Sequence, residues 1–309
     1  LTSNTEYEVY VRANCGVDDL SNWVGPITFT TACDPFPVPF FEGFNTDSET
    51  QNCWTVVNEN GDNDSWNMDY AFNPYEGDQS AAITTDFNNG NNDDWLISPT
   101  ILLTGNQRLK FHQRVQSGFE PNDFEVLLST TGTAIADFTL ELVPSAEYDN
   151  TDYIEYIVIL DDAADALISG PVNIAWHVPN GGLDGWRLYI DNVIVEDIPS
   201  CPDPTDLTAG NFQPTSVDLS WTAGFNETDW EVVVQAPGTR EPTDATPVVD
   251  VTTDPEYTAD GLTSNTVYEY YVRANCGVDD LSNWIGPFEF TTACDPFPVP
   301  FFEGFNTDS

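Results

Sequence analysis

Basic residues are scarce in this chain. Only 7 of its 309 residues are Lys or Arg, against 52 Asp and Glu, and the formal net charge is −45. A chain with so few cations cannot neutralise phosphates, which excludes nucleic-acid binding. Anionic membrane surfaces repel it as well. No apolar run approaches the ~20 residues of a membrane span, so we expect no direct membrane insertion.

Helical patterns are also nearly absent. The only helix-like stretch covers residues 161–168. Short alternating apolar and polar runs dominate instead, separated by Asn, Gly, Asp and Pro. With 40% hydrophobic and 13% aromatic residues, the chain can fold despite its charge. The pattern predicts an all-β protein, with strands at residues 6–12, 216–221, 230–235, 267–273 and 288–292.

A long internal repeat indicates the organisation of the chain. Residues 1–48 recur as residues 262–309, and 43 of the 48 positions are identical. A period of 261 residues is far longer than a solenoid repeat, so each period should hold whole domains. We therefore expect a window from a longer tandem array, whose partners are adjacent repeats of the same chain.

Residues 200–293 resemble a fibronectin type III domain. Val217-Asp-Leu-Ser-Trp221 is similar to its strand B with the core tryptophan, and Trp230-Glu-Val-Val-Val is similar to its strand C. Leu262-Thr-Ser-Asn-Thr-Val-Tyr268 is similar to the turn before strand F with its corner tyrosine. By the same comparison, residues 1–33 match only strands F and G of an incomplete domain.

Residues 34–199 resemble the MAM-like jelly rolls of secreted bacterial adhesins, the cleaved-adhesin and choice-of-anchor J group. Residues 294–309 then begin the next such domain. The resemblance implies a jelly-roll β-sandwich alternating with fibronectin domains on the cell surface, exported by the type IX route. The motifs that carry it are Pro39-Phe-Phe-Glu-Gly-Phe, Cys53-Trp-Thr-Val-Val, Asn58-Glu-Asn-Gly-Asp-Asn-Asp-Ser-Trp, Asp94-Trp-Leu-Ile-Ser-Pro and Gly185-Trp-Arg-Leu-Tyr-Ile-Asp-Asn-Val.

Two groups of residues are candidate calcium ligands. Asn58, Asn60, Asp62 and Asp64 alternate around a glycine, so their oxygens can converge on one hard cation. The alternative is an Asx-rich turn without metal. The adhesin resemblance, whose members carry calcium-binding Asp-rich loops here, favours Ca²⁺.

Glu42 and Asp191 form the second candidate group. They lie in apolar surroundings on what the resemblance makes the first and last strands, which are neighbours in a jelly roll. Two facing carboxylates repel each other unless a cation or protons intervene. Related jelly rolls use such a pair for structural calcium. The alternative is that strand alternation turns one or both side chains to solvent.

Each period contains an even number of cysteines, which in an acidic exported chain indicates disulfides. In a fibronectin sandwich, the start of strand A and the end of strand F share a pole, which pairs Cys201 with Cys276. Cys33 ends one module and Cys53 begins the next, so we expect these two to pair across the junction. Cys15 and Cys294 would then find partners outside this window.

No arrangement in the sequence supports catalysis. His112 and His177 lie outside any nucleophile or metal motif, and chance carboxylate pairs are unavoidable among 52 acids. Trp66, Trp95, Trp176 and Trp186 are either a sugar-binding platform or, more commonly in sandwiches, core residues.

The sequence therefore predicts a non-enzymatic repeat segment of a giant extracellular adhesin or cell-surface fibre. Calcium and disulfides would stiffen each period, and parallel copies could bundle into one fibre. The alternative is a receptor module for a cell-surface glycan or protein, with the fibronectin domains as spacers.

Overall fold

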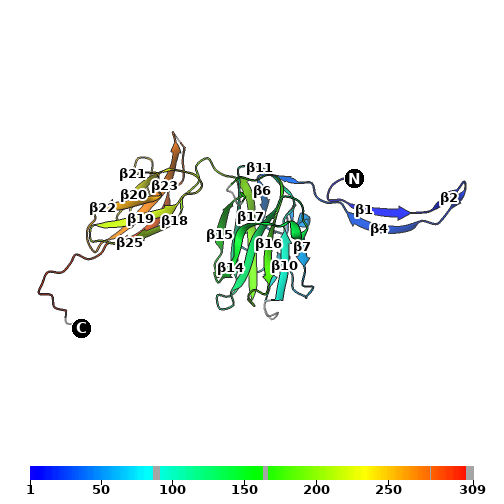
Figure 1. The fold of residues 1–309 in the computed structure, drawn as a ribbon, viewed down its shortest axis with the longest axis horizontal. Helices are drawn as coiled ribbons and strands as arrows, with labels where there is room; N and C mark the ends of the chain where they lie inside the picture. The colour runs from blue at the N-terminus through cyan, green and yellow to red at the C-terminus, as the bar shows by residue number, and fades with distance from the viewer. Residues whose placement is uncertain (86–90, 163–165, 279, 304–309) are drawn as a thin grey trace. The chain divides into compact units, whose positions relative to one another are not determined.

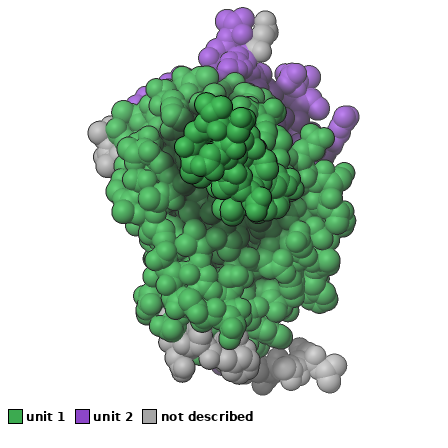
Figure 2. Space-filling view, turned by 90° about the vertical axis from the view of Figure 1, so that its right-hand side faces the viewer, with its two compact units in different colours: residues 1–198 green, residues 199–309 purple. Residues whose placement is uncertain are grey.

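A computed structural model describes residues 1–85, 91–162, 166–278 and 280–303. The described chain is built almost entirely of β-strands (Figure 1). It divides into two compact units, Leu1–Ile198 and Pro199–Ser309, which are coloured separately in Figure 2. Each unit is described by itself.

The first unit begins with a β-hairpin. Strand β1 (Glu6–Val11) pairs antiparallel with β4 (Val24–Thr30), and the short strands β2 (Asn14–Gly16) and β3 (Asp19–Leu20) extend the tip. Apolar side chains such as Val9 and Ile27 are exposed on it. The equivalent residues of the second unit, Tyr270 and Phe288, pack in a core.

Residues 36–197 form a sandwich of two antiparallel-dominated sheets. The first sheet has the order β14-β13-β16-β10-β7. Strand β11 pairs with the N-terminal part of β16, and β5 pairs with β11. The order follows from long-range pairing rather than from neighbouring hairpins. Its strands are β5 (Phe36–Pro37), β7 (Thr55–Asn58), β10 (Asn91–Ile97), β11 (Ile101–Thr104), β13 (Asn122–Ser129), β14 (Leu140–Tyr148) and β16 (Ser169–Asn180).

The second sheet has the order β15-β12-β17-β9-β8, and β6 pairs with the far end of β17. Strands β6 and β17, the first and last strands of this sheet in chain order, are thus adjacent, as the resemblance implies. The strands are β6 (Phe40–Glu42), β8 (Asn67–Tyr70), β9 (Ser80–Thr84), β12 (Gln107–Val115), β15 (Ile154–Ile159) and β17 (Arg187–Asp197).

The two sheets enclose one apolar core. Strand β12 shows the alternation that makes it, because Leu109, Phe111 and Val115 are fully buried in the core while Arg108, Lys110 and Arg114 at the alternate positions are only half-buried. Trp176 of the opposite sheet meets Phe111 edge-on at a ring-centroid distance of 5.4 Å. This core holds the strand ends that carry the candidate site.

The helix-like stretch at residues 161–168 is not a helix where the structure describes it. Asp161 and Leu167 form an isolated antiparallel bridge, and Ile168 donates its backbone N–H to the carbonyl of Leu160. Residues 163–165 lie outside the described residues. The helices of the described chain are two short 3₁₀ turns, η1 (Gln51–Cys53) and η2 (Ile135–Asp137), and neither is long enough to cross a membrane.

The second unit is a smaller sandwich. One sheet has the order β18-β19-β22 and the other β21-β20-β23 with β25 on the far side of β23. Trp221 and Trp230, from opposite sheets, are buried with ring centroids 5.8 Å apart. The strands are β18 (Thr205–Gly210), β19 (Ser216–Thr222), β20 (Asp229–Gln235), β21 (Val249–Thr252), β22 (Glu256–Asp260), β23 (Val267–Gly277), β24 (Asp280–Leu281) and β25 (Ile285–Thr291).

Candidate functional site

The acidic loop at residues 58–64 begins where β7 ends. The side-chain oxygen of Asn58 accepts the backbone N–H of Gly61 at 2.7 Å, and its NH₂ group donates to the carbonyl of Asp64 at 2.8 Å. Asp62 accepts from the backbone of Asp64 and from the side chain of Asn60, both at 2.8 Å. In these contacts the loop is a set of nested Asx turns, which is the alternative that the sequence left open.

A buried carboxylate lies directly beneath this loop. Asp94 on β10 is paired with Asn58 across the strands and is fully buried. Its Oδ1 has no hydrogen-bond partner among the described residues, and its Oδ2 accepts only a long bond, 3.4 Å, from the backbone of Asp93. The pKa of Asp94 is raised to about 7, mainly by burial and to a smaller extent by the charges of Asp62, Asp93 and Asp64, while the Asp93 backbone N–H lowers it. A carboxylate in this position needs a proton or a cation.

The loop and Asp94 together suit a hard cation in composition. Ca²⁺ takes six to eight oxygen ligands and accepts carboxylate, amide and backbone carbonyl oxygens. Within the described ranges, no three His, Cys, Asp or Glu side chains are gathered closely enough to hold a metal. A calcium site here would therefore also use amide and carbonyl oxygens.

Sequence reasoning did not include Asp94 among the candidate ligands. It appeared only as part of a motif, and its pairing with Asn58 depends on which strand lies beside β7. One signal was available, since an acidic residue directly preceding the buried run Trp95-Leu96-Ile97 is unusual.

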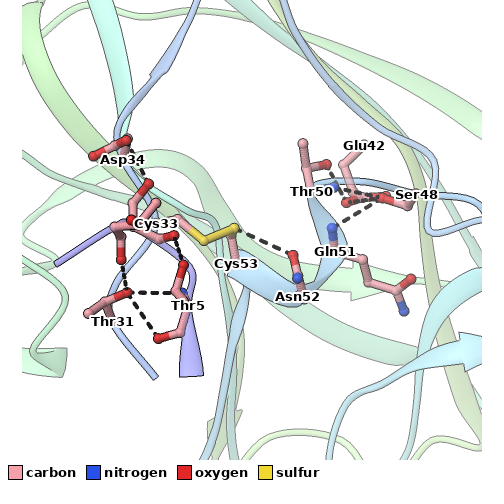
Figure 3. The surroundings of a disulfide bond; sticks show 12 residues. Thr5, Thr31, Cys33, Asp34, Glu42, Ser48, Thr50, Gln51, Asn52 and Cys53 are labelled. Carbon is pink, nitrogen blue, oxygen red and sulfur yellow. Dashed lines mark hydrogen bonds between the residues drawn. A yellow bond between two sulfur atoms is a disulfide. The ribbon is translucent and has the colours of Figure 1, made fainter. Parts of the chain in front are cut away.

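Glu42 ends strand β6 and is buried. Its Oε1 accepts the backbone N–H of Phe44 at 2.6 Å, and its Oε2 accepts the hydroxyls of Ser48 at 2.9 Å and Thr50 at 2.7 Å (Figure 3). The carboxylate therefore ties down the segment that follows β6.

Asp191 lies on the neighbouring strand β17, two residues before the partner of Glu42, which is Val193. It is also buried, and it accepts backbone N–H groups of Tyr75 at 2.7 Å and Asn192 at 2.7 Å. Burial raises its pKa to about 6, although these hydrogen bonds lower it. The two carboxylates thus share a region of the sheet but bind different segments, and their pairing around calcium stays a prediction.

Both predicted disulfides are present. Cys33 is bonded to Cys53, with a Cα–Cα distance of 5.9 Å, and joins the hairpin to the turn η1 (Figure 3). Cys201 is bonded to Cys276 at a Cα–Cα distance of 5.6 Å. Cys15 and Cys294 are free and exposed.

The candidate tryptophan platform is not an exposed surface. Trp66, Trp95 and Trp176 are buried, and of the four only Trp186 is exposed, by 39%. The histidines are also structural in their contacts: His177 lies between Glu125 and Asp93, at 2.7 and 3.1 Å, and stacks on Trp95. His112 stacks on Tyr75 at 3.5 Å.

Comparison with known proteins agrees with this architecture. Residues 38–156 match the family model of the Cleaved Adhesin Domain. The similarity supports a non-catalytic, adhesin-type extracellular module. A search of curated proteins found no match.

Solved structures share the two folds. The K1 and K3 cleaved adhesin domains of Lys-gingipain from Porphyromonas gingivalis are each 17% identical, cover 52% and 51% of this chain and 99% and 98% of their own, and have TM-scores of 0.42 and 0.43. The fibronectin domain of human collagen alpha-1(XX) is 24% identical, covers 32% of this chain and 91% of its own, and has a TM-score of 0.27. The chain is an all-β protein in which a jelly-roll sandwich is followed by a fibronectin type III sandwich.

Proposed function

We propose that this chain is a repeat segment of a large secreted adhesin or cell-surface fibre, in which jelly-roll and fibronectin modules alternate and carry tension. The family match of residues 38–156 supports the adhesive class. The near-identity of residues 1–48 and 262–309 supports the tandem arrangement. Export by the type IX route is part of this proposal.

The Cys33–Cys53 bond is the observation that carries the structural function. It connects the last residues of a fibronectin-like hairpin covalently to the next module, across the proline-rich connector of residues 34–39. Proline-rich connectors are semi-rigid spacers. Cys294 stands at the equivalent place before an identical connector, and its partner would be the counterpart of Cys53 in an adjacent repeat.

Calcium is the second stiffening element of the proposal. The unpartnered oxygen of Asp94, beneath a loop rich in Asn and Asp oxygens, supports one Ca²⁺ site. Glu42 and Asp191 remain candidates for another. A net charge of −45 keeps parallel copies apart, and divalent cations bridging acidic surfaces would allow them to bundle.

Pulling the chain by its ends in single-molecule force spectroscopy tests the function. If it carries tension, the Cys201–Cys276 bond shields 75 residues from extension, so loss of that one bond lengthens the fully unfolded chain by about 250 Å at ~3.3–3.6 Å per residue. The Cys201→Ser/Cys276→Ser variant should show the longer length without reductant. Unfolding of both units at negligible force, in calcium and with disulfides intact, would reject a tension-bearing role.

The receptor alternative is favoured by a separate feature, the outer face of the second jelly-roll sheet.

A further inference from the structure

Positive charge is concentrated on one face of the sheet β15-β12-β17-β9-β8. Arg108, Lys110 and Arg114 alternate along β12 with residues of the core, so they project from the outer face. Arg187 begins β17 and lies on the same face as Tyr189, because Leu188 between them is in the core. Four of the seven basic residues of the chain are thus on one face.

The two ends of this face differ in how the cations are compensated. Arg108 is bonded to Glu196 at 2.7 Å, and Lys110 to Glu155 at 3.1 Å. Across the described ranges, neither Arg114 nor Arg187 has a carboxylate within 4.0 Å. In a chain with 52 acidic residues, two arginines without an acidic partner among the described residues are unexpected.

Aromatic rings hold these two arginines in place instead. The guanidinium of Arg187 lies 4.7 Å from the ring centre of Tyr70. That of Arg114 lies 5.2 Å from Tyr189 and 5.7 Å from Tyr153. Tyr70 meets Tyr189 edge-on at 5.7 Å, so the arginines and tyrosines form one continuous series of contacts that involves β8, β17, β12 and the residue before β15. The stacking fixes the planes of both guanidinium groups.

The hydrogen bonds of the two arginines use only part of each guanidinium. Arg187 donates from Nε to the hydroxyl of Thr84 at 3.2 Å, and Arg114 donates from Nε to the carbonyl of Val115 at 3.4 Å. The hydroxyl of Tyr189 is a further hydrogen-bond partner of Arg187. Among the residues that the structure describes, the terminal NH₂ groups of Arg114 have no acceptor, and both side chains are half-buried. A fixed, partly desolvated guanidinium with free NH₂ groups binds carboxylates with two parallel hydrogen bonds.

We propose that this Arg–Tyr face, formed by Arg114, Arg187, Tyr70 and Tyr153 around the fully buried Tyr189, binds an acidic glycan through its uronate carboxylates. Tyr70 and Tyr153 are half-buried, so part of each ring remains available to the C–H face of a sugar. Nearby Gln116 and Thr84 offer polar groups for sugar hydroxyls. These features favour a sugar over an acidic peptide, which needs no ring surface.

The overall charge of the chain opposes such a ligand only at long range. At physiological salt, charges more than about 8 Å apart are largely screened. Recognition then depends on the short-range contacts with the two arginines. The proposal goes beyond the structural function above, and its failure leaves that function intact.

Isothermal titration of the full chain with a β-linked oligoglucuronate tests the proposal. The control ligand is the corresponding cello-oligosaccharide, which has a hydroxymethyl group in place of each carboxylate. We expect binding of the oligoglucuronate and at least tenfold weaker binding of the neutral sugar, since tenfold is about what one lost charge-assisted contact costs. Equal affinities for the two sugars, or no binding of either, would overturn the proposal.

Variants locate the site. Arg114→Gln and Arg187→Gln should each weaken oligoglucuronate binding by about tenfold or more. Arg240→Gln removes the same charge from an exposed position in the other unit and should leave binding unchanged. Arg114→Lys and Arg187→Lys keep the charge and the fold but lose the planar donor pair, so they should also bind more weakly.

Two outcomes would contradict the assignment. Binding that survives all four substitutions at these arginines would come from elsewhere, for example from calcium bridging the acidic surface to the sugar. An oligo-aspartate peptide that binds the same arginines as tightly as the oligoglucuronate would make the ligand a protein segment instead.

Discussion

Asp94 and Asn58 are direct cross-strand partners, so a fully buried carboxylate with an unpartnered oxygen lies at the base of an acidic loop. Sequence neighbours would not reveal this relationship, since 36 positions separate the two residues in the chain numbering. It places a buried carboxylate that the sequence did not single out beside the loop that the sequence suggested for calcium.

Calcium should stabilise the first unit through Asp94. A ligand that binds only the native state adds about 2.7 kcal/mol at a hundredfold excess over its dissociation constant. We therefore expect the melting temperature of the first unit to rise with Ca²⁺ and to fall with chelator, and the Asp94→Asn variant to lose most of this response. Differential scanning calorimetry measures it. Asp149→Asn, an exposed carboxylate in the same unit, is the matched control. A full calcium response in the Asp94→Asn protein would exclude Asp94 as a ligand.

Without calcium, the stability contribution of Asp94 should decrease as pH rises. Its pKa is 3.8 ordinarily and about 7 in the folded chain, so the unfolded state loses its proton first. The stabilisation is complete below about pH 4 and is lost as pH rises to about 7. The difference corresponds to at most about 4 kcal/mol at 1.36 kcal/mol per pH unit. Urea unfolding in chelator should show a smaller decline between these pH values for Asp94→Asn than for the unmodified chain; parallel curves would contradict the buried, ionisable state.

Removing the Cys33–Cys53 bond should destabilise the first unit alone. The bond closes a span of 20 residues that contains β5, β6 and η1, for which chain-entropy models give about 3 kcal/mol. The Cys33→Ser/Cys53→Ser variant should lower the unfolding midpoint of the first unit and leave that of the second unchanged. The Cys201→Ser/Cys276→Ser variant should do the reverse. A shift of both units in either variant would mean that they unfold together.

Tyr270 should stabilise the second unit through its hydroxyl. The buried hydroxyl lies 2.9 Å from the carbonyl of Thr208 and 3.0 Å from that of Ser220, so it bridges two neighbouring strands. Tyr270→Phe should cost about 1–2 kcal/mol in the free energy of unfolding, because a buried hydrogen bond is lost while the ring is kept. Tyr271→Phe, at the next position of the same strand, is the control for loss of a tyrosine hydroxyl. An unchanged denaturation midpoint would show that the hydroxyl contributes nothing.

Local pattern in the sequence predicted the strand content, comparison of the chain with itself revealed the repeat, and the family resemblances implied the two kinds of sandwich. Alternating apolar residues such as Leu109, Phe111 and Val115 indicate a strand, because successive side chains of a strand face opposite sides of the sheet. The helix-like stretch at 161–168 is not helical in the described residues, because eight residues are too few for their periodicity to distinguish a helix from a bridge. The disulfide pairs followed from the family resemblance together with the positions of cysteines at module ends.

The contacts across strands were decided only by the tertiary structure. Strand order places Asp94 beside Asn58 and separates the hydrogen-bond partners of Glu42 from those of Asp191. It also brings Arg114 of β12 opposite Tyr189 of β17, near Arg187. Nothing in the sequence relates Arg114 to the other two residues. Long-range register depends on the packing of the whole core rather than on local propensity. For that reason the sequence could name candidate residues, while the fold determined which of them meet.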